Sequence, residues 1–503
     1  MQRSNKNHKH LFIMKKLITY IGKVMVLSIL IMGLGCENFL QEEPKSFIGP
    51  STFFQTPADA EAAVIAGYDE LGAFNPGTFG WWRAWTFEIL NDDWDTRPEV
   101  AANNSRNLGR YITFDPDAPL LASVYDSWIH GMNTFSTAID GINEMEDFDG
   151  KQALIAEAKF LRAYHYFVLV RLFGPVPIID QALGAEEARN LPRAGSEEEV
   201  YELIISDLDA GVQDLPEQAV APGRATRWAA MGLLAKVHLT LENWSEAAQL
   251  AQSVIQNSPH QLLEEYTQIF SEDNENNSES IFEIQMEVGN ERSNQVGQWP
   301  RGIGANGDQD YFLGPNWGGV YIATQDLLDD FESGDERRAL IDTMVTRNDG
   351  TEIIFNADGA TPWYSLKRVP SAYIEGREAN NNSGYNFIYL RLGEIYLIAA
   401  EAENEVNGPG NAYQYINPVR ERAGLSPLSG LTQQEFRQAV RKERRTELFD
   451  ERKRLFDLYR WGTVIERVNE ARPDAQIQSH HTLWPIPTNA LDNNPQLTQN
   501  PGY

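Results

Sequence analysis

The chain has 503 residues, 42% hydrophobic and 23% charged, which is typical of a folded globular protein. Its formal net charge of −30 at pH 7 argues against a nucleic-acid-binding protein, because such proteins need a basic surface to meet phosphate groups. It also argues against docking on anionic lipid through a polybasic patch. The single cysteine excludes a disulfide framework and any zinc or iron–sulfur site built from cysteines.

Residues 1–35 have the pattern of an export signal. Residues 1–23 carry six basic and no acidic side chains, residues 24–34 are uncharged and largely apolar, and a glycine precedes Cys36. The apolar run is shorter than the ~20 residues that a membrane-spanning helix needs, so we expect the segment to be removed. Met14, followed by two lysines, is a second candidate for its start.

A signal that ends at the one cysteine of the chain resembles a bacterial lipoprotein signal, in which Cys36 becomes the acylated first residue. The match is incomplete, because the usual pattern has leucine three residues before the cysteine, where this chain has Gly33. An ordinary signal peptide with an incidental cysteine is the alternative. Removal of the signal leaves 36 basic against 72 acidic residues, a formal charge of −36. We expect an exported, acidic, lipid-anchored protein.

The rest of the chain predicts mainly α-helix. Residues 36–57 are rich in turn-forming residues and are predicted to form a linker from the anchor, followed by one body over residues 58–503. Ser196 and Glu199 have the spacing of a capping box. Apolar residues recur at helical spacing over about 59–72, 120–173, 196–257 and 388–460.

Two pairs of alanine-rich segments look like tetratricopeptide helix hairpins. The first pair spans residues 225–242 and 244–256, and the second spans 388–406 and 412–424. Small residues let two helices approach closely, so the pattern predicts an all-α, mostly helical fold with a hairpin solenoid as one wall.

A charged helix is predicted over residues 433–459. Charges this dense usually lie on a solvated face. Its apolar residues give it one packed side, and we interpret Glu443, Arg444, Arg445 and Glu447 as structural ion pairs rather than a binding patch.

Two long stretches, about 74–119 and 260–386, are predicted to be irregular, with weak strand patterns such as ESIFEIQM. Loops this long inside a compact domain are usually functional. They are rich in glycine, asparagine, aspartate and tryptophan, whereas Trp128, Trp228, Trp244 and Trp461 lie in or beside helices and are expected in the core.

Several motifs together resemble the SusD/RagB family of surface glycan-binding lipoproteins of Bacteroidetes. They cover the whole mature chain: CENFLQEEP, FFQTPADAEAAVIAGYDEL, EAKFLRAYHYFVLVRLFGPVPII, GRATRWAAMGLLAKVHLTLENWSEAAQLAQSVI, ERRTELFDERKRLFDLYRWG and LWPIPTNALDNNPQLTQNPGY. One departure is Arg452, where the family often has glycine in a Glu-Gly-x-Arg motif, and this change bears on how the helix ends.

The resemblance implies a protein that binds polysaccharide or oligosaccharide without cleaving it, and that delivers it to a SusC-like TonB-dependent transporter in the outer membrane. It implies a surface-exposed, lipid-anchored location, no catalytic residues and no cofactor. Residues 272–275 could hold a calcium ion, but their spacing fits no calcium loop, and a solvated acidic loop is the default expectation. The acidic charge favours a neutral glucan, because an anionic field repels an anionic polymer. The alternative is a tetratricopeptide-type scaffold lipoprotein that binds protein and no sugar.

Sugar rings stack on flat aromatic faces, and their hydroxyl groups bind polar side chains, so we place the candidate site on the loop-rich stretches. Its candidate residues are Trp81, Trp82, Arg83, Asn91, Asp92, Asp93, Trp94, Trp299, Tyr311, Trp317 and Tyr321. The opposing interpretation is that these aromatic residues are buried, and that Asp92 and Asp93 cap turns rather than act as a glycosidase pair. Residues 302–307 satisfy GxGxxG but lack the strand–turn–helix context of a nucleotide site.

Overall fold

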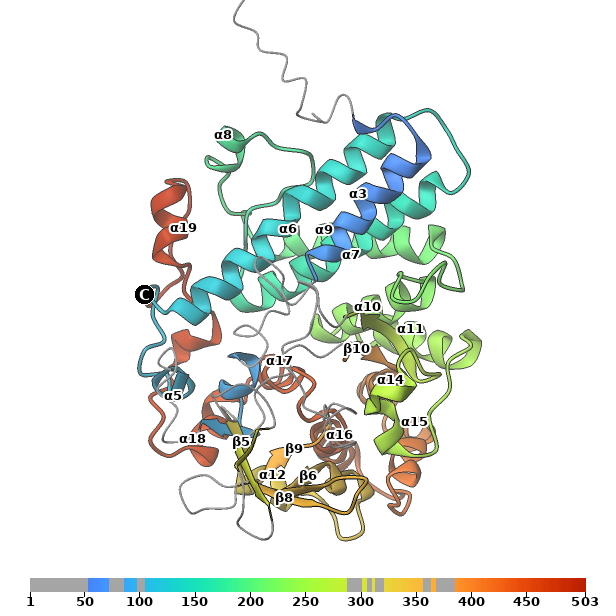
Figure 1. The fold of residues 1–503 in the computed structure, drawn as a ribbon, viewed down its shortest axis with the longest axis vertical. Coiled ribbons are helices and arrows are strands. Elements are labelled where there is room, and N and C mark those ends of the chain that lie inside the picture. The colour runs from blue at the N-terminus through green and yellow to red at the C-terminus, as the bar shows by residue number, and fades with distance from the viewer. Residues whose placement is uncertain are drawn as a thin grey trace, which may run out of the picture. The chain divides into compact units, whose positions relative to one another are not determined.

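The computed structural model describes residues 53–71, 86–96, 105–286, 301–304, 310–312, 321–355, 363–367 and 385–503. The chain divides into two units, residues 1–53 and 54–503, and every element below belongs to the second unit. Helices predominate in this unit and its strands are short (Figure 1), so the predicted mostly helical fold is confirmed.

The helix α7 (Lys151–Phe173) is the central element of the first helical layer. It packs against α6 (Pro119–Glu144) and α9 (Glu197–Asp214), and α3 (Pro57–Asp69) contacts both α6 and α7. With neighbours on several sides, nearly all side chains of α7 beyond its first turn are buried, and these include the polar residues Glu157, Arg162 and His165. The helix ends at Gly174, whose φ of +70° suits glycine.

Two helix hairpins form the second layer. They are α10 (Arg227–Thr240) with α11 (Trp244–Asn257), and α14 (Leu392–Asn407) with α15 (Pro409–Arg422). Because α11 packs against α14, the two hairpins stack, and α16 (Gln433–Leu448) covers α14 and α15. The small residues between them are all buried: Ala229, Ala230, Ala235, Ala247, Ala248, Ala251, Ala399, Ala400 and Ala402. The two predicted hairpins are therefore confirmed.

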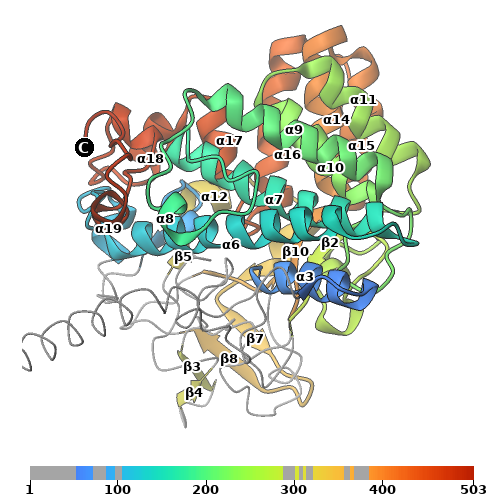
Figure 2. The ribbon, with the colours of Figure 1, turned by 90° about the horizontal axis from the view of Figure 1, so that it is seen from above.

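Short antiparallel strands lie in the stretches predicted to be loop-rich. The strand predicted from ESIFEIQM is β2 (Ser280–Ile284), and it pairs with β10 (Phe387–Arg391). The other sheets are β1 (Trp94–Thr96) with β5 (Tyr321–Ala323), β6 (Ile341–Asp342) with β9 (Tyr364–Ser365), and the order β4 (Asp310–Phe312), β3 (Arg301–Gly304), β8 (Glu352–Phe355), β7 (Met344–Thr346). In Figure 2 the four-stranded sheet lies below α6 and α7, and the hairpin helices lie above them.

The remaining elements are short. They are α5 (Ser105–Gly109), α8 (Ala185–Ala188), α12 (Gln325–Asp330), α17 (Arg454–Arg460), α18 (Val464–Ala471), α19 (Thr488–Asn493), and the 3-10 turns η2 (Tyr266–Phe270), η3 (Glu272–Asn274), η4 (Glu336–Leu340) and η5 (Ser479–Thr482).

The start of α9 differs from the predicted capping box. The helix begins after Ser196, as expected, but the Ser196 side chain accepts no hydrogen bond from the helix backbone. The Glu199 carboxylate instead accepts the N–H of Gly195 at 3.2 Å, one residue earlier than a capping box requires.

The predicted charged helix 433–459 is two helices, not one. The helix α16 ends at Leu448, and α17 begins at Arg454. Between them Asp450 and Arg452 have φ values of +56° and +58°, a left-handed backbone that ends the helix. Arg452 is the position where the family often has glycine, so here a side chain occupies a conformation that favours glycine.

The charges of this stretch face inward rather than toward solvent. Glu447 is fully buried and accepts hydrogen bonds from Arg391 at 2.5 Å, Arg422 at 2.5 Å and Arg337 at 3.1 Å. Burial alone would raise the pKa of Glu447, but the three guanidinium groups hold it well below its usual range. Glu443 binds Arg337 at 2.6 Å. The interpretation of these charges as structural ion pairs is confirmed, and the expectation of a solvated face is wrong.

We predict that Glu447→Gln lowers the free energy of unfolding by about 3–5 kcal/mol, because it leaves buried guanidinium groups without their anion. Urea unfolding followed by circular dichroism measures this loss. Glu405→Gln is the matched control: its partner Arg437 is 33% exposed, so we expect a loss of at most about 1 kcal/mol. Equal losses in the two variants would contradict the structural role of the buried network.

The stability of the protein should also depend on His165. This side chain is fully buried, its ring centroid is 4.9 Å from that of Trp128 and 4.7 Å from that of Phe135, and burial lowers its pKa to about 3. The unfolded chain binds a proton at this site below about pH 6.5, whereas the folded protein does so only near pH 3, so folding stability falls as the pH decreases through this window.

We predict that His165→Phe removes up to about 1.4 kcal/mol per pH unit from the dependence of the unfolding free energy on pH between 6 and 4.5. Urea unfolding at several pH values measures both slopes. Identical slopes for wild type and variant would show that His165 is protonated in the folded state.

Candidate functional site

The segment 86–96 holds four of the predicted site residues, and the structure places them in the interior. Trp94 is fully buried in β1, opposite Ala323 of β5, with its ring edge-on to that of Tyr321 at 5.3 Å. The Tyr321 hydroxyl donates to Asp450 at 3.1 Å. The structure therefore brings Trp94 and Tyr321 together, as a packed aromatic pair.

The carboxylates of Asp92 and Asp93 are also fully buried. Asp92 accepts two hydrogen bonds of 2.7 Å from Arg454 and one of 3.0 Å from Arg467, and Asp93 accepts one of 2.7 Å from Arg445. Burial would raise the pKa of Asp92, but these guanidinium groups hold it well below its usual range. Burial and the adjacent charge of Asp92 raise the pKa of Asp93 in spite of Arg445.

Asn91 shapes the turn that carries these carboxylates. Its amide donates to Glu88 at 2.8 Å, and its side-chain oxygen accepts the N–H of Asp93 at 2.8 Å. Arg472 holds the same turn from the other side, because it donates to the backbone oxygens of Ile89, Asn91 and Trp94 at 2.6–2.8 Å. The turn is thus built from internal hydrogen bonds.

The burial of four candidate residues contradicts their expected role as ligand contacts: Asn91, Asp92, Asp93 and Trp94. All four have 0% exposed surface, so a polysaccharide cannot reach them in this conformation. They support the segment rather than contact a ligand. A glycosidase role for Asp92 and Asp93 is not supported either, because both carboxylates are enclosed and bound to arginines.

Most of the other predicted residues lie outside the described part of the chain: Trp81, Trp82, Arg83, Trp299, Trp317 and the anchor residue Cys36. Tyr311 lies in β4, of which the backbone is described, and Tyr321 is half-buried. The proposed ligand contacts of these residues remain predictions. Within the described ranges, no helix is long and apolar enough to cross a membrane.

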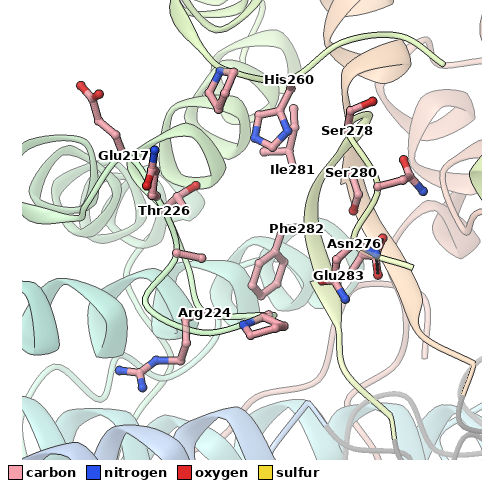
Figure 3. A pocket seen from close by; sticks show the side chains of 16 residues that line it. Glu217, Arg224, Thr226, His260, Asn276, Ser278, Ser280, Ile281, Phe282 and Glu283 are labelled. Atoms are coloured by element: carbon pink, nitrogen blue, oxygen red, sulfur yellow. Dashed lines mark hydrogen bonds between the residues drawn. The ribbon is translucent and has the colours of Figure 1, made fainter. Parts of the chain in front are cut away.

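A hollow of about 370 Å³ lies between strand β2 and the loop that precedes α10 (Figure 3). Its lining comes from the loop 217–226, from Pro259 and His260 after α11, and from the segment 276–283. We call it the β2 hollow. In Figure 3 Phe282 projects from β2 toward the loop that carries Arg224. His260 lies on the opposite side of Phe282 from Arg224.

The charged residues that line the β2 hollow, Glu217, Arg224 and Glu283, all have hydrogen-bond partners, and Glu217 accepts from Arg227 at 3.0 Å. Figure 3 shows the Arg224 guanidinium turned away from the hollow, where it donates to Glu157 at 2.6 and 2.8 Å. Glu283 accepts the N–H of Asn276 at 2.9 Å and the side-chain amide of Asn386 at 3.1 Å. Burial raises the pKa of Glu283.

A second hollow of about 270 Å³ lies where α11, α14, α16 and α17 meet. Trp244 and Trp461 line it; both are half-buried and pack against the core, whereas Trp128 and Trp228 are buried in it as predicted. Its charges form bidentate pairs, Arg437 with Glu405 and Arg460 with Glu401, at 2.6 Å.

Neither hollow could be predicted from the sequence, because each is assembled from segments far apart in the chain. The sequence feature that comes nearest to indicating the β2 hollow is the apolar loop beside it. In this loop the Val220 side chain is 68% exposed. Among the residues with described side chains, no three His, Cys, Asp or Glu residues are grouped so as to hold a metal ion. The GxGxxG motif begins in strand β3.

Comparison with known proteins identifies the family. A family model described as the SusD family matches residues 340–503, and one described as starch-binding associating with outer membrane matches residues 84–239. SusD-like protein P25 of Formosa agariphila is 32% identical, over 93% of this chain and 96% of its own length. The starch-binding protein SusD of Bacteroides thetaiotaomicron is 24% identical, over 87% of this chain and 89% of its own.

A solved structure of a laminarin-binding SusD-like protein has the same fold, with a TM-score of 0.73 and 24% identity over 89% of this chain and 100% of that one. The predicted family resemblance is confirmed by the matches along nearly the full length of the chain. This chain belongs to the SusD family.

Proposed function

We propose that this protein binds a neutral polysaccharide at a cell surface, without cleaving it, and delivers it to a TonB-dependent transporter in the outer membrane. The observation that carries the proposal is membership of the SusD family over nearly the whole chain, with relatives named as binding starch and laminarin. Both of these polymers are uncharged glucans. Lipid anchoring through Cys36 belongs to the same proposal.

The charge of the protein supports an uncharged ligand. Mature protein that begins at Cys36 carries a formal charge of −36, and an anionic field lowers the local concentration of an anionic polymer. Recognition of a neutral sugar relies instead on aromatic stacking and hydroxyl hydrogen bonds, neither of which needs an opposite charge.

The described carboxylates near the candidate loops support binding without hydrolysis. A glycosidase needs two accessible carboxyl groups about 5–10 Å apart on either side of the scissile bond. Asp92 and Asp93 are enclosed, and Glu88, whose pKa burial raises to about 7, is 1% exposed and accepts the Arg452 N–H at 2.7 Å.

We predict that the soluble chain from Glu37 onward is retarded in affinity electrophoresis by one neutral glucan, such as starch or laminarin, more than by sulfated or uronate-rich polymers. Trp81→Ala/Trp82→Ala should abolish the retardation, because aromatic platforms contribute about 1–3 kcal/mol each to ligand stacking on comparable surfaces. Retardation by no polymer would contradict the proposal and favour the protein-binding scaffold. Stronger retardation by an acidic polymer would contradict the neutral ligand.

Trp94→Ala should behave differently from the Trp81/Trp82 variant, because Trp94 is packed and not exposed. We expect a loss of about 3–5 kcal/mol in the free energy of unfolding from the cavity that it leaves. Trp94→Phe should restore most of the stability and retain glucan binding. A Trp94→Ala protein with wild-type stability and no binding would reassign Trp94 to the ligand.

A further inference from the structure

We propose that the β2 hollow is a second sugar-binding site, which takes an uncharged sugar unit of the same polysaccharide. This inference rests on the proposed function, but it concerns a site separate from the predicted loop residues. The hollow has about 370 Å³, which is within the range of about 300–1,000 Å³ that small-ligand sites occupy.

The lining of the β2 hollow has both kinds of group that a sugar needs. Its apolar members include the prolines Pro222 and Pro259, which are exposed. Its hydrogen-bonding members without charge include Gln218 and Ser278, which are exposed as well. A pyranose ring has an apolar face of C–H groups and a rim of hydroxyl groups, so it can contact both kinds of group.

The pairing of the charges selects against an acidic sugar. Arg224 is the basic residue among those that line the hollow, and its guanidinium is bound to Glu157 and to Glu61, at 3.1 Å, on its outer side. Burial lowers the pKa of His260, which disfavours a positive charge on its ring. No described lining residue therefore offers an unpaired cation to a carboxylate or sulfate. The carboxylates of Glu217 and Glu283, which also line the hollow, add a further repulsion against an acidic sugar.

The hollow is also preformed. Gly223, with φ of +77°, lies so close to Gln285 that an added Cβ would be 2.3 Å from its Cγ, so the loop packs directly on the chain beyond β2. Arg224 fixes the same loop to α7 through Glu157. A rigid site loses little conformational entropy when a ligand binds.

The test uses the soluble chain from Glu37 onward, with maltoheptaose and laminarihexaose as neutral probes. We compare wild type with Gln218→Ala/His260→Ala, which removes one polar and one ring contact from the hollow. The matched control is Gln256→Ala/His130→Ala, which changes the same two residue types at exposed positions outside the hollow. Isothermal titration gives affinity and stoichiometry, and hydrogen exchange reports protection of residues 217–226 and 276–283.

We expect one of the probes to bind wild type and the control equally and to protect both segments. In Gln218→Ala/His260→Ala this protection should be lost and the affinity of that site should fall at least about tenfold, with an unchanged melting temperature. Trp81→Ala/Trp82→Ala should keep the protection at the hollow. Probe binding by wild type without protection there, or unchanged binding by the hollow variant, would overturn this inference and leave the proposed function intact. Absence of any oligosaccharide or polysaccharide binding would overturn both.

Discussion

The buried arginine–carboxylate network is the constraint on which the rest of this structure depends. An isolated charge in the interior costs several kcal/mol, so each member is stable there only when its partners are in place. Those partners come from distant parts of the chain: Asp92 and Arg454 are 362 residues apart, and Glu447 receives guanidinium groups from η4, from the end of β10 and from α15. The hairpin layer and the segment 86–96 are therefore stable only together, because neither can satisfy its charges alone.

The same network connects the fold with the candidate ligand face. Arg472 and Arg454 hold the turn at residues 89–94 through its backbone oxygens and through Asp92, so this segment is fixed from Thr86 onward. Trp81 and Trp82, the predicted ligand contacts, precede this segment by only a few residues in the sequence. Binding sites on loops need such support, because ordering a loose loop at the moment of binding reduces the affinity. In this chain the support is electrostatic, through Arg454 and Arg472, and also apolar, through the buried side chains of Ile89, Leu90 and Trp94.

The sequence predicts the parts of the fold that depend on local periodicity. Helices α7, α10, α11 and α14 follow from apolar residues at helical spacing, and the stop at Gly174 follows from backbone chemistry. The break between α16 and α17 does not, because Asp450 and Arg452 adopt a left-handed backbone for the sake of contacts with residues far along the chain. The burial of Asp92 and Trp94 also could not be predicted from the sequence. An aspartate or a tryptophan in a polar stretch gives the same sequence pattern whether its side chain contacts a sugar or packs inside the protein. The β2 hollow could not be predicted because three separate segments form it.

Because many arginines of this chain are buried, they affect the charge that a ligand meets at the surface. Arginines 337, 391, 422, 444, 445 and 454 are all bound to buried carboxylates, so they do little to offset the acidic residues that remain on the surface. A surface of this kind repels polyanions over the ~8 Å Debye length at physiological salt and has no such effect on neutral polymers. Contacts through prolines and amide groups, such as those proposed for the β2 hollow, are among the ones that such a surface leaves available. Their strength depends little on ionic strength, so the proposed binding of a neutral glycan should be equally strong in dilute and in saline surroundings.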